Sequence, residues 1–150
     1  MIGSVLNSFK ANGGYALKKY LNDKDKKKDK PSVEDLLQSY EASERDNLKG
    51  SIFGAIFKVR LDNSHPLAYG YGSDYFSLKT NPMRLSFLED GANVGVLKGD
   101  SKPVSGFAGS KAVDKLDDSL VFGVESKGRG EIVYMVDNPL FRGFWENGKL

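Results

Sequence analysis

A change of pattern at Gly50 constrains the fold of this chain more than any other feature of its sequence. Before Gly50, apolar residues recur at the spacing of short helices. After it, short apolar runs are separated by glycine, proline and asparagine, which is typical of strands and turns. The longest run, Ser51–Leu61, predicts a strand, and His65-Pro66 ends or bends it. Further short strands are predicted at residues 77–78, 85–88, 93–97, 120–124 and 132–136.

The last two predicted strands, Leu120–Val124 and Ile132–Val136, are joined by Lys127–Gly130, and this pattern predicts a hairpin. Ile132–Val136 is apolar on both faces, which predicts a central strand covered on both sides. Asp137–Pro139 predicts a helix start, because a polar cap precedes a proline in the first turn. The apolar residues that follow at helical spacing are Leu140, Phe141, Phe144 and Trp145.

Two helices are predicted before Gly50, on either side of a charged run. The first spans about Ser4 to Asn12. Residues 22–30 contain no apolar side chain, so we interpret them as a solvated loop. A phosphate-binding basic arm is the alternative, although interleaved aspartates weaken its positive field. Ser32 is the predicted cap of the second helix, which ends near Asn47–Gly50. Its apolar stripe consists of Leu36, Leu37 and Tyr40.

The order of the predicted elements is helices, then strands, then a terminal helix. We therefore expect residues 1–150 to form a single α/β domain or a fragment of one. A complete doubly wound fold begins with a βα unit, which this sequence lacks. The domain is accordingly expected to be incomplete at its N-terminal side.

The composition excludes several classes of site. The 150 residues contain no cysteine and one histidine, His65. Disulfides, thiolate metal sites and cysteine nucleophiles are therefore excluded. One histidine also does not supply the ligands of a typical catalytic zinc, so we expect no metal and no cofactor in this chain. The net charge of +2 is too small to indicate nucleic acid, and no apolar run reaches the roughly 20 residues of a membrane helix. Neither nucleic acid nor a membrane is an expected partner.

No catalytic residue is predicted. A serine triad would need His65 as its base, but the sequence has no G-x-S-x-G motif, and the neighbouring Ser64 would point to the opposite face of an extended strand. A structural histidine in a turn is therefore favoured for His65. Gly143–Leu150 matches the glycine and lysine spacing of a phosphate loop, but Leu150 stands where a hydroxyl should meet magnesium. An amphipathic helix ending at Asn147-Gly148 is the favoured interpretation.

A few side chains remain as candidates for binding. Tyr69 and Tyr71, with the nearby Tyr75 and Phe76, lie among glycines, where aromatic rings stack on sugars or clamp peptides. Packing of a sheet edge is the alternative. Arg142 is able to hold a carboxylate through two hydrogen bonds, although a structural salt bridge is favoured. The candidate binding residues are His65, Tyr69, Tyr71 and Arg142.

Several stretches in a fixed order carry a resemblance to a known family. They are Gly54–Val59 with Leu61–Gly70, Gly91–Gly95, Ser105–Phe107 and Gly128–Trp145. Together they resemble the C-terminal region of large bacterial zinc carboxypeptidases of the carboxypeptidase A superfamily. The resemblance covers residues 50–150 and only loosely the part before them. The Phe141-Arg142-Gly143-Phe144-Trp145 stretch is its most specific piece.

The resemblance implies a flavodoxin-like fold of the class I glutamine-amidotransferase type. It also implies a non-catalytic accessory role, structural or in substrate positioning, beside the peptidase domain of the same parent protein. Zinc and the chemistry would belong to that peptidase domain, because its H-x-x-E motif, later histidine and catalytic glutamate have no counterpart here. Export to the periplasm or the exterior is implied for the parent family.

Two other functions stay open. One is a free-standing module that binds a glycan or a peptide through the aromatic loop 69–76. The other is a degenerate amidotransferase-like hydrolase that uses His65. His65-Pro66 resembles the His-Pro-Glu of class I glutamine amidotransferases, but Leu67 replaces the glutamate and the chain has no cysteine for the histidine to serve.

Overall fold

The computed structural model describes residue 33, residue 37 and residues 39–143, and the structural statements below refer to these residues. Several predictions fall outside them. These are the helix at residues 4–12, the charged loop at residues 22–30, the cap at Ser32, and the positions of Phe144 and Trp145.

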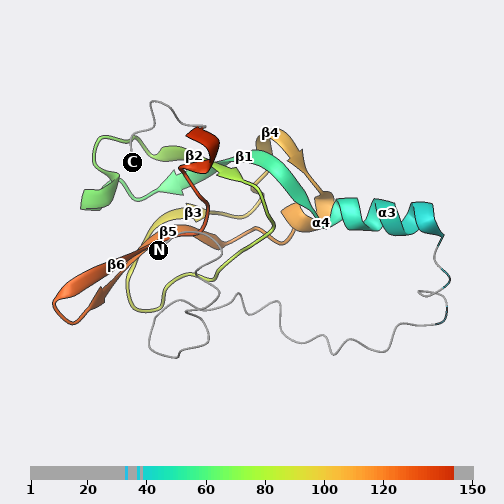
Figure 1. Cartoon of the computed structure of the whole chain (residues 1–150). Coiled ribbons are helices and arrows are strands. Elements are labelled where there is room, and N and C mark those ends of the chain that lie inside the picture. Colours follow the sequence, from blue (N-terminus) through green and yellow to red (C-terminus); the bar gives the residue numbers. More distant parts are fainter. Residues whose placement is uncertain (1–32, 34–36, 38, 144–150) are drawn as a thin grey trace.

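The described part of the chain is dominated by one curled antiparallel sheet (Figure 1). Its strand order is β2-β1-β3-β5-β6, and β4 also pairs with β1. Short helical elements lie between and beside the strands. The strands are β1 (Ile52–Leu61), β2 (Asp74–Lys79), β3 (Ala92–Leu97), β4 (Pro103–Ala108), β5 (Ser119–Lys127) and β6 (Gly130–Met135). The helices are α3 (Tyr40–Lys49) and α4 (Ser110–Val113), with 3-10 turns η3 (Pro66–Ala68) and η4 (Phe141–Gly143).

The predicted α/β, flavodoxin-like and amidotransferase-like fold is wrong. That fold requires parallel strands with helices on both faces of the sheet. Every strand pair within the described residues is antiparallel, and tight connections such as the β5–β6 turn replace helical crossovers. Sequence order alone does not distinguish these architectures, because an antiparallel sheet preceded by a helix gives the same succession of patterns.

Strand β1 is the centre of the sheet and agrees with the predicted strand at Ser51–Leu61. It pairs with β2 along one side, and with β4 and then β3 along the other. Ala55, Phe57 and Val59 alternate inward and are fully buried, as the two-residue period of a strand requires. A strand with neighbours on both sides and one buried face anchors the core.

The predicted hairpin of β5 and β6 is confirmed. Lys127 pairs with Gly130, and Gly128 has φ +62°, a left-handed conformation that glycine adopts without strain. The prediction that Ile132–Val136 is a central strand is wrong, because β6 lies at the edge of the sheet. Its two faces are both apolar for another reason. Tyr134 packs in the core, whereas Met135 lines a cavity described below.

The buried hydrophobic side chains of the described residues form three clusters. One cluster joins β1, β3 and β5 to α4 and to Leu116. A second cluster packs Tyr134 of β6 against Leu85 and Leu88. Leu85–Leu88, predicted as a strand, forms only a single bridge at Leu85. The side chain of Asn93 holds this segment instead, because its Oδ1 accepts from Leu88 N–H at 2.7 Å and its Nδ2 donates to Leu88 O at 3.1 Å.

Helix α3 extends away from the sheet (Figure 1). Its cap is Ser39, whose hydroxyl accepts from the Ala42 N–H at 3.3 Å, and it ends at Gly50. The predicted apolar stripe is wrong for its described members, because Leu37 and Tyr40 are exposed. An ion pair of 3.2 Å between Lys111 and Asp46 joins α4 to α3, and hydrogen bonds from Lys111 and then Lys49 lower the pKa of Asp46.

Candidate functional site

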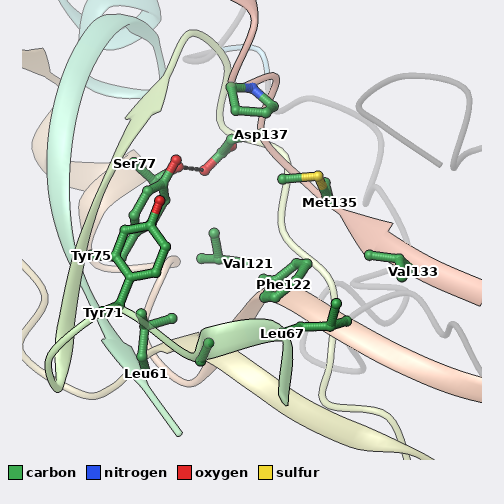
Figure 2. A pocket seen from close by; sticks show the side chains of 12 residues that line it. Leu61, Leu67, Tyr71, Tyr75, Ser77, Val121, Phe122, Val133, Met135 and Asp137 are labelled. Atoms are coloured by element: carbon green, nitrogen blue, oxygen red, sulfur yellow. Dashed lines mark hydrogen bonds between the residues drawn. The ribbon is translucent and has the colours of Figure 1, made fainter. Parts of the chain in front are cut away.

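A cavity of about 220 Å³ opens between β2, the η3 turn and the β5–β6 hairpin (Figure 2). Segments from three distant parts of the sequence meet there. The lining residues are Leu61, Leu67, Ala68, Tyr71, Tyr75, Ser77, Val121, Phe122, Val133, Met135, Asp137 and Pro139.

The side walls of the cavity are apolar. Leu67 comes from η3, Phe122 from β5, and Val133 and Met135 from the outward face of β6. Figure 2 shows these side chains opposite the rings of Tyr71 and Tyr75. An occupant of this space would therefore contact hydrocarbon and aromatic surface on most of its sides.

One end of the cavity is polar and centres on Asp137. Its Oδ2 accepts from the Ser77 hydroxyl at 2.7 Å, and its Oδ1 accepts from Lys79 Nζ at 2.8 Å. The exposed fractions of the Lys79 and Asp137 side chains are only 1% and 6%. Ser77 and Lys79 are two residues apart on β2, so they share the face that looks toward the end of β6.

Two tyrosines form the wall beside this polar end. The rings of Tyr71 and Tyr75 meet edge to face, with centroids 5.9 Å apart and planes at 89°. The Tyr71 hydroxyl oxygen is buried and finds no hydrogen-bond partner among the described residues. Burial raises the pKa of Tyr71. Burial also raises the pKa of Tyr75, with further contributions from the charges of Tyr71 and Asp137. Both phenols therefore keep their protons to a higher pH than an ordinary tyrosine does.

The η3 turn sets the position of the cavity's mouth. His65 precedes it, and its Nδ1 accepts from the Leu67 N–H at 3.3 Å. Gly70 then turns the chain at φ +89°, and the Tyr71 N–H donates to Ala68 O at 3.1 Å. His65 thus orders the turn that presents Leu67 and Ala68 to the cavity, and its own side chain is not part of the lining.

The other predicted binding residues lie apart from the cavity. Tyr69 is exposed, with a fraction of 67%, and is not part of the lining. Arg142 is exposed in a left-handed conformation at φ +53°, with its guanidinium 5.2 Å from the centroid of the Phe141 ring. Of the candidates His65, Tyr69, Tyr71 and Arg142, the structure brings Tyr71 into the cavity.

Sequence reasoning missed Ser77, Lys79 and Asp137. The sequence pattern predicts a helix start at Asp137, but the neighbouring Asn138 makes that turn, with its Oδ1 accepting from the Leu140 N–H at 3.0 Å. The alternation in β2 points the other way. Phe76 and Leu78 lie on one face and Tyr75, Ser77 and Lys79 on the other, so apolar character favours burial of Phe76 and Leu78, whereas the structure buries Ser77 and Lys79. The inward Lys79 is accommodated because Asp137 supplies the opposite charge.

The opposite face of the sheet carries a second feature, which we call the outer apolar face. Ile56 lies opposite Leu78 of β2 and opposite Ser105 of β4, so these strands share one outward surface. The rings of Phe53 and Phe107 stack on it with centroids 6.1 Å apart. The residues of the outer apolar face are Phe53, Ile56, Phe76, Leu78 and Phe107.

No group of three or more histidine, aspartate and glutamate side chains within the described ranges is placed to hold a metal ion. None of the helices in the described part of the chain is long and apolar enough to cross a membrane.

No family model matches the chain, and no significantly similar curated protein or solved structure was found.

Proposed function

We propose that this chain is a non-catalytic accessory region of a zinc carboxypeptidase and that it packs on the peptidase domain through the outer apolar face. Its role would be structural or in positioning the substrate. The observation that carries the proposal is the exposure of Phe53, Phe76 and Phe107 on one face of the sheet, with exposed fractions of 68%, 43% and 49%.

An outward sheet face that carries three exposed aromatic rings, two of them stacked, favours a protein partner. Exposed apolar residues are ordinary when scattered singly, but a contiguous patch with a polar rim is typical of an interface. The rim here includes Lys58, which lies opposite Phe76 and pairs with Asp74 at 3.0 Å. Aromatic residues at the centre of such a patch often dominate the binding energy.

The choice of partner rests on the sequence resemblance. Two of the stretches that carry it, Gly54–Val59 and Ser105–Phe107, supply residues of the outer apolar face. Two others, Leu61–Gly70 and Gly128–Trp145, contain residues that line the cavity. The similar segments therefore coincide with the two surface features on which a partner or ligand would act.

In this proposal, catalysis belongs to the peptidase domain. The one histidine of the chain has its Nδ1 lone pair engaged by the Leu67 N–H, as a turn-forming residue would. In the peptidase domain zinc would polarise the scissile carbonyl and activate water. This chain would hold or extend the substrate-binding surface.

The test is a binding measurement between the full chain and the peptidase domain encoded with it. Phe53→Ser combined with Phe107→Ser should weaken binding by about tenfold or more, since each is a central aromatic contact. The matched control is Leu140→Ser, which removes an equally exposed apolar side chain outside that face. Equal affinities for the wild type and the double variant would overturn the docking surface.

A second candidate function is a free-standing binding module that uses the aromatic loop 69–76. The observation in its favour is that Tyr71 and Tyr75 of this loop line the cavity. Specific binding of a ligand by the isolated chain, with no affinity for a peptidase domain, would favour it over the accessory role.

A further inference from the structure

We propose that the cavity between β2, η3 and the β5–β6 hairpin is a binding site for a neutral aromatic ring that carries one hydroxyl group. The ring would lie between the tyrosines and the β6 side chains. Its hydroxyl would bond to the Tyr71 hydroxyl at the polar end. This site does not depend on the accessory role proposed above.

The size of the cavity fits a single substituted ring. A cavity of roughly 150 Å³ lined by apolar side chains holds benzene. This one measures about 220 Å³, so it has room for a ring with one or two additional heavy atoms. A sugar of similar size would leave several hydroxyls facing Leu67, Phe122 and Val133 without partners, which is costly.

The lining favours an aromatic ring over an aliphatic one. Tyr71 and Tyr75 already meet edge to face, and a third ring can extend this arrangement. Phe122 offers a further ring, and Met135 places a thioether in the wall opposite the tyrosines (Figure 2). Sulfur and aromatic edges make favourable contacts of this kind.

The polar end specifies a single neutral hydroxyl. The Tyr71 hydroxyl is buried with no hydrogen-bond partner in the described part of the chain, and such a group is costly unless an occupant or water satisfies it. The Asp137 carboxylate uses one lone pair on each oxygen for Ser77 and Lys79, so each oxygen keeps a second lone pair that can accept from a ligand hydroxyl. Because Lys79 already balances the charge of Asp137, a charged ligand would bring an uncompensated charge into the cavity.

The experiment compares p-cresol with toluene, which has the same ring and methyl group but no hydroxyl. Binding to the full chain is measured by calorimetry or by chemical-shift changes. Wild type should prefer p-cresol by about 2- to 10-fold, the range expected for one net hydrogen bond. Tyr71→Phe should remove this preference while toluene binding is retained. The control Tyr69→Phe alters an exposed ring outside the lining and should leave both affinities unchanged.

A blocking variant tests the location. Val133→Phe adds volume inside the cavity and should abolish binding of both probes, with the unfolding midpoint showing that the variant still folds. Equal wild-type affinities for the two probes, no binding of either, or an unchanged preference in Tyr71→Phe would each overturn the proposal.

The ring could belong to a free small molecule or to a tyrosine in a peptide. A short peptide with a central tyrosine, set against the same peptide with phenylalanine, separates these sources. Competition between the tyrosine peptide and p-cresol would identify a peptide side chain as the ligand. Binding of p-cresol without competition by the peptide would identify a free phenol.

Discussion

Lys79 and Asp137 form an ion pair in the interior, with 2.8 Å between Lys79 Nζ and Asp137 Oδ1. The two residues are 58 positions apart in the sequence, and the pair joins β2 to the end of β6 across the cavity's polar end. The Ser77 hydroxyl completes the arrangement by donating to the other carboxylate oxygen. Strands β2 and β6 lie at opposite ends of the strand order, so the ion pair connects the two edges of the curled sheet.

We predict that Asp137→Ala destabilises the fold by about 3–5 kcal/mol, because it leaves the buried Lys79 charge without a partner. Lys79→Met combined with Asp137→Leu should recover most of this loss, since both charges are then removed. Denaturant titration measures each free energy of unfolding.

Asp74→Ala is the matched control for that prediction. It breaks the half-exposed pair with Lys58 at 3.0 Å, and it should cost less than about 1 kcal/mol. Similar losses for Asp137→Ala and Asp74→Ala would show that burial does not strengthen the interior pair.

Gly106→Ala should destabilise the pairing of β4 with β1. Gly106 has φ +87°, and an added Cβ would collide with the backbone of Gly54 and Ala55. Backbone strain alone predicts a loss of about 1–3 kcal/mol. Gly99→Ala is the control, because Gly99 has open space around it, and it should change stability by within about 0.5 kcal/mol. Equal unfolding midpoints for Gly106→Ala and Gly99→Ala would contradict the close approach of Gly106 to the β1 backbone.

Stability should fall at alkaline pH partly through Tyr75. Burial, followed by the charges of Tyr71 and Asp137, raises the pKa of Tyr75 above its ordinary value of 10.0. The folded chain therefore keeps a proton that the unfolded chain releases. The stabilising contribution of the neutral Tyr75 phenol is complete below pH 10.0 and is lost as the pH rises from there through the pKa of Tyr75 in the folded chain. Unfolding free energies at increasing pH should decline more steeply in wild type than in Tyr75→Phe, and parallel declines would contradict this.

The purified chain should hold no stoichiometric zinc after dialysis, because it has one histidine and no cysteine. Metal analysis is the measurement. One tightly bound zinc per chain that disappears in His65→Ala would contradict the prediction.

Local features of the fold were predictable from the sequence. Gly128 permits the left-handed turn of the β5–β6 hairpin, and the alternation of β1 reflects a strand with one buried face. The position of β6 was not predictable. A run that is apolar on both faces indicates that both are covered, but not whether a second layer or a cavity covers the outer one.

The candidate site was predictable only in part. Tyr71 was predictable as a binding residue, because aromatic residues placed between glycines are visible in the local sequence. The partnership of Lys79 with Asp137 is a property of the topology, since it depends on how the ends of β2 and β6 meet. Asp137 also begins the Asp137-Asn138-Pro139 sequence, which is equally typical of a turn or a helix start, so the local sequence does not reveal its ion pair.

The most direct test of the accessory role is the mass and peptide content of the native gene product, recovered from its source cells with an antibody against this chain. The account predicts a product much longer than 150 residues, in which tryptic peptides of this chain occur together with the H-x-x-E motif of a zinc carboxypeptidase. A native product of these 150 residues alone, with no peptidase sequence in the same polypeptide, would contradict it.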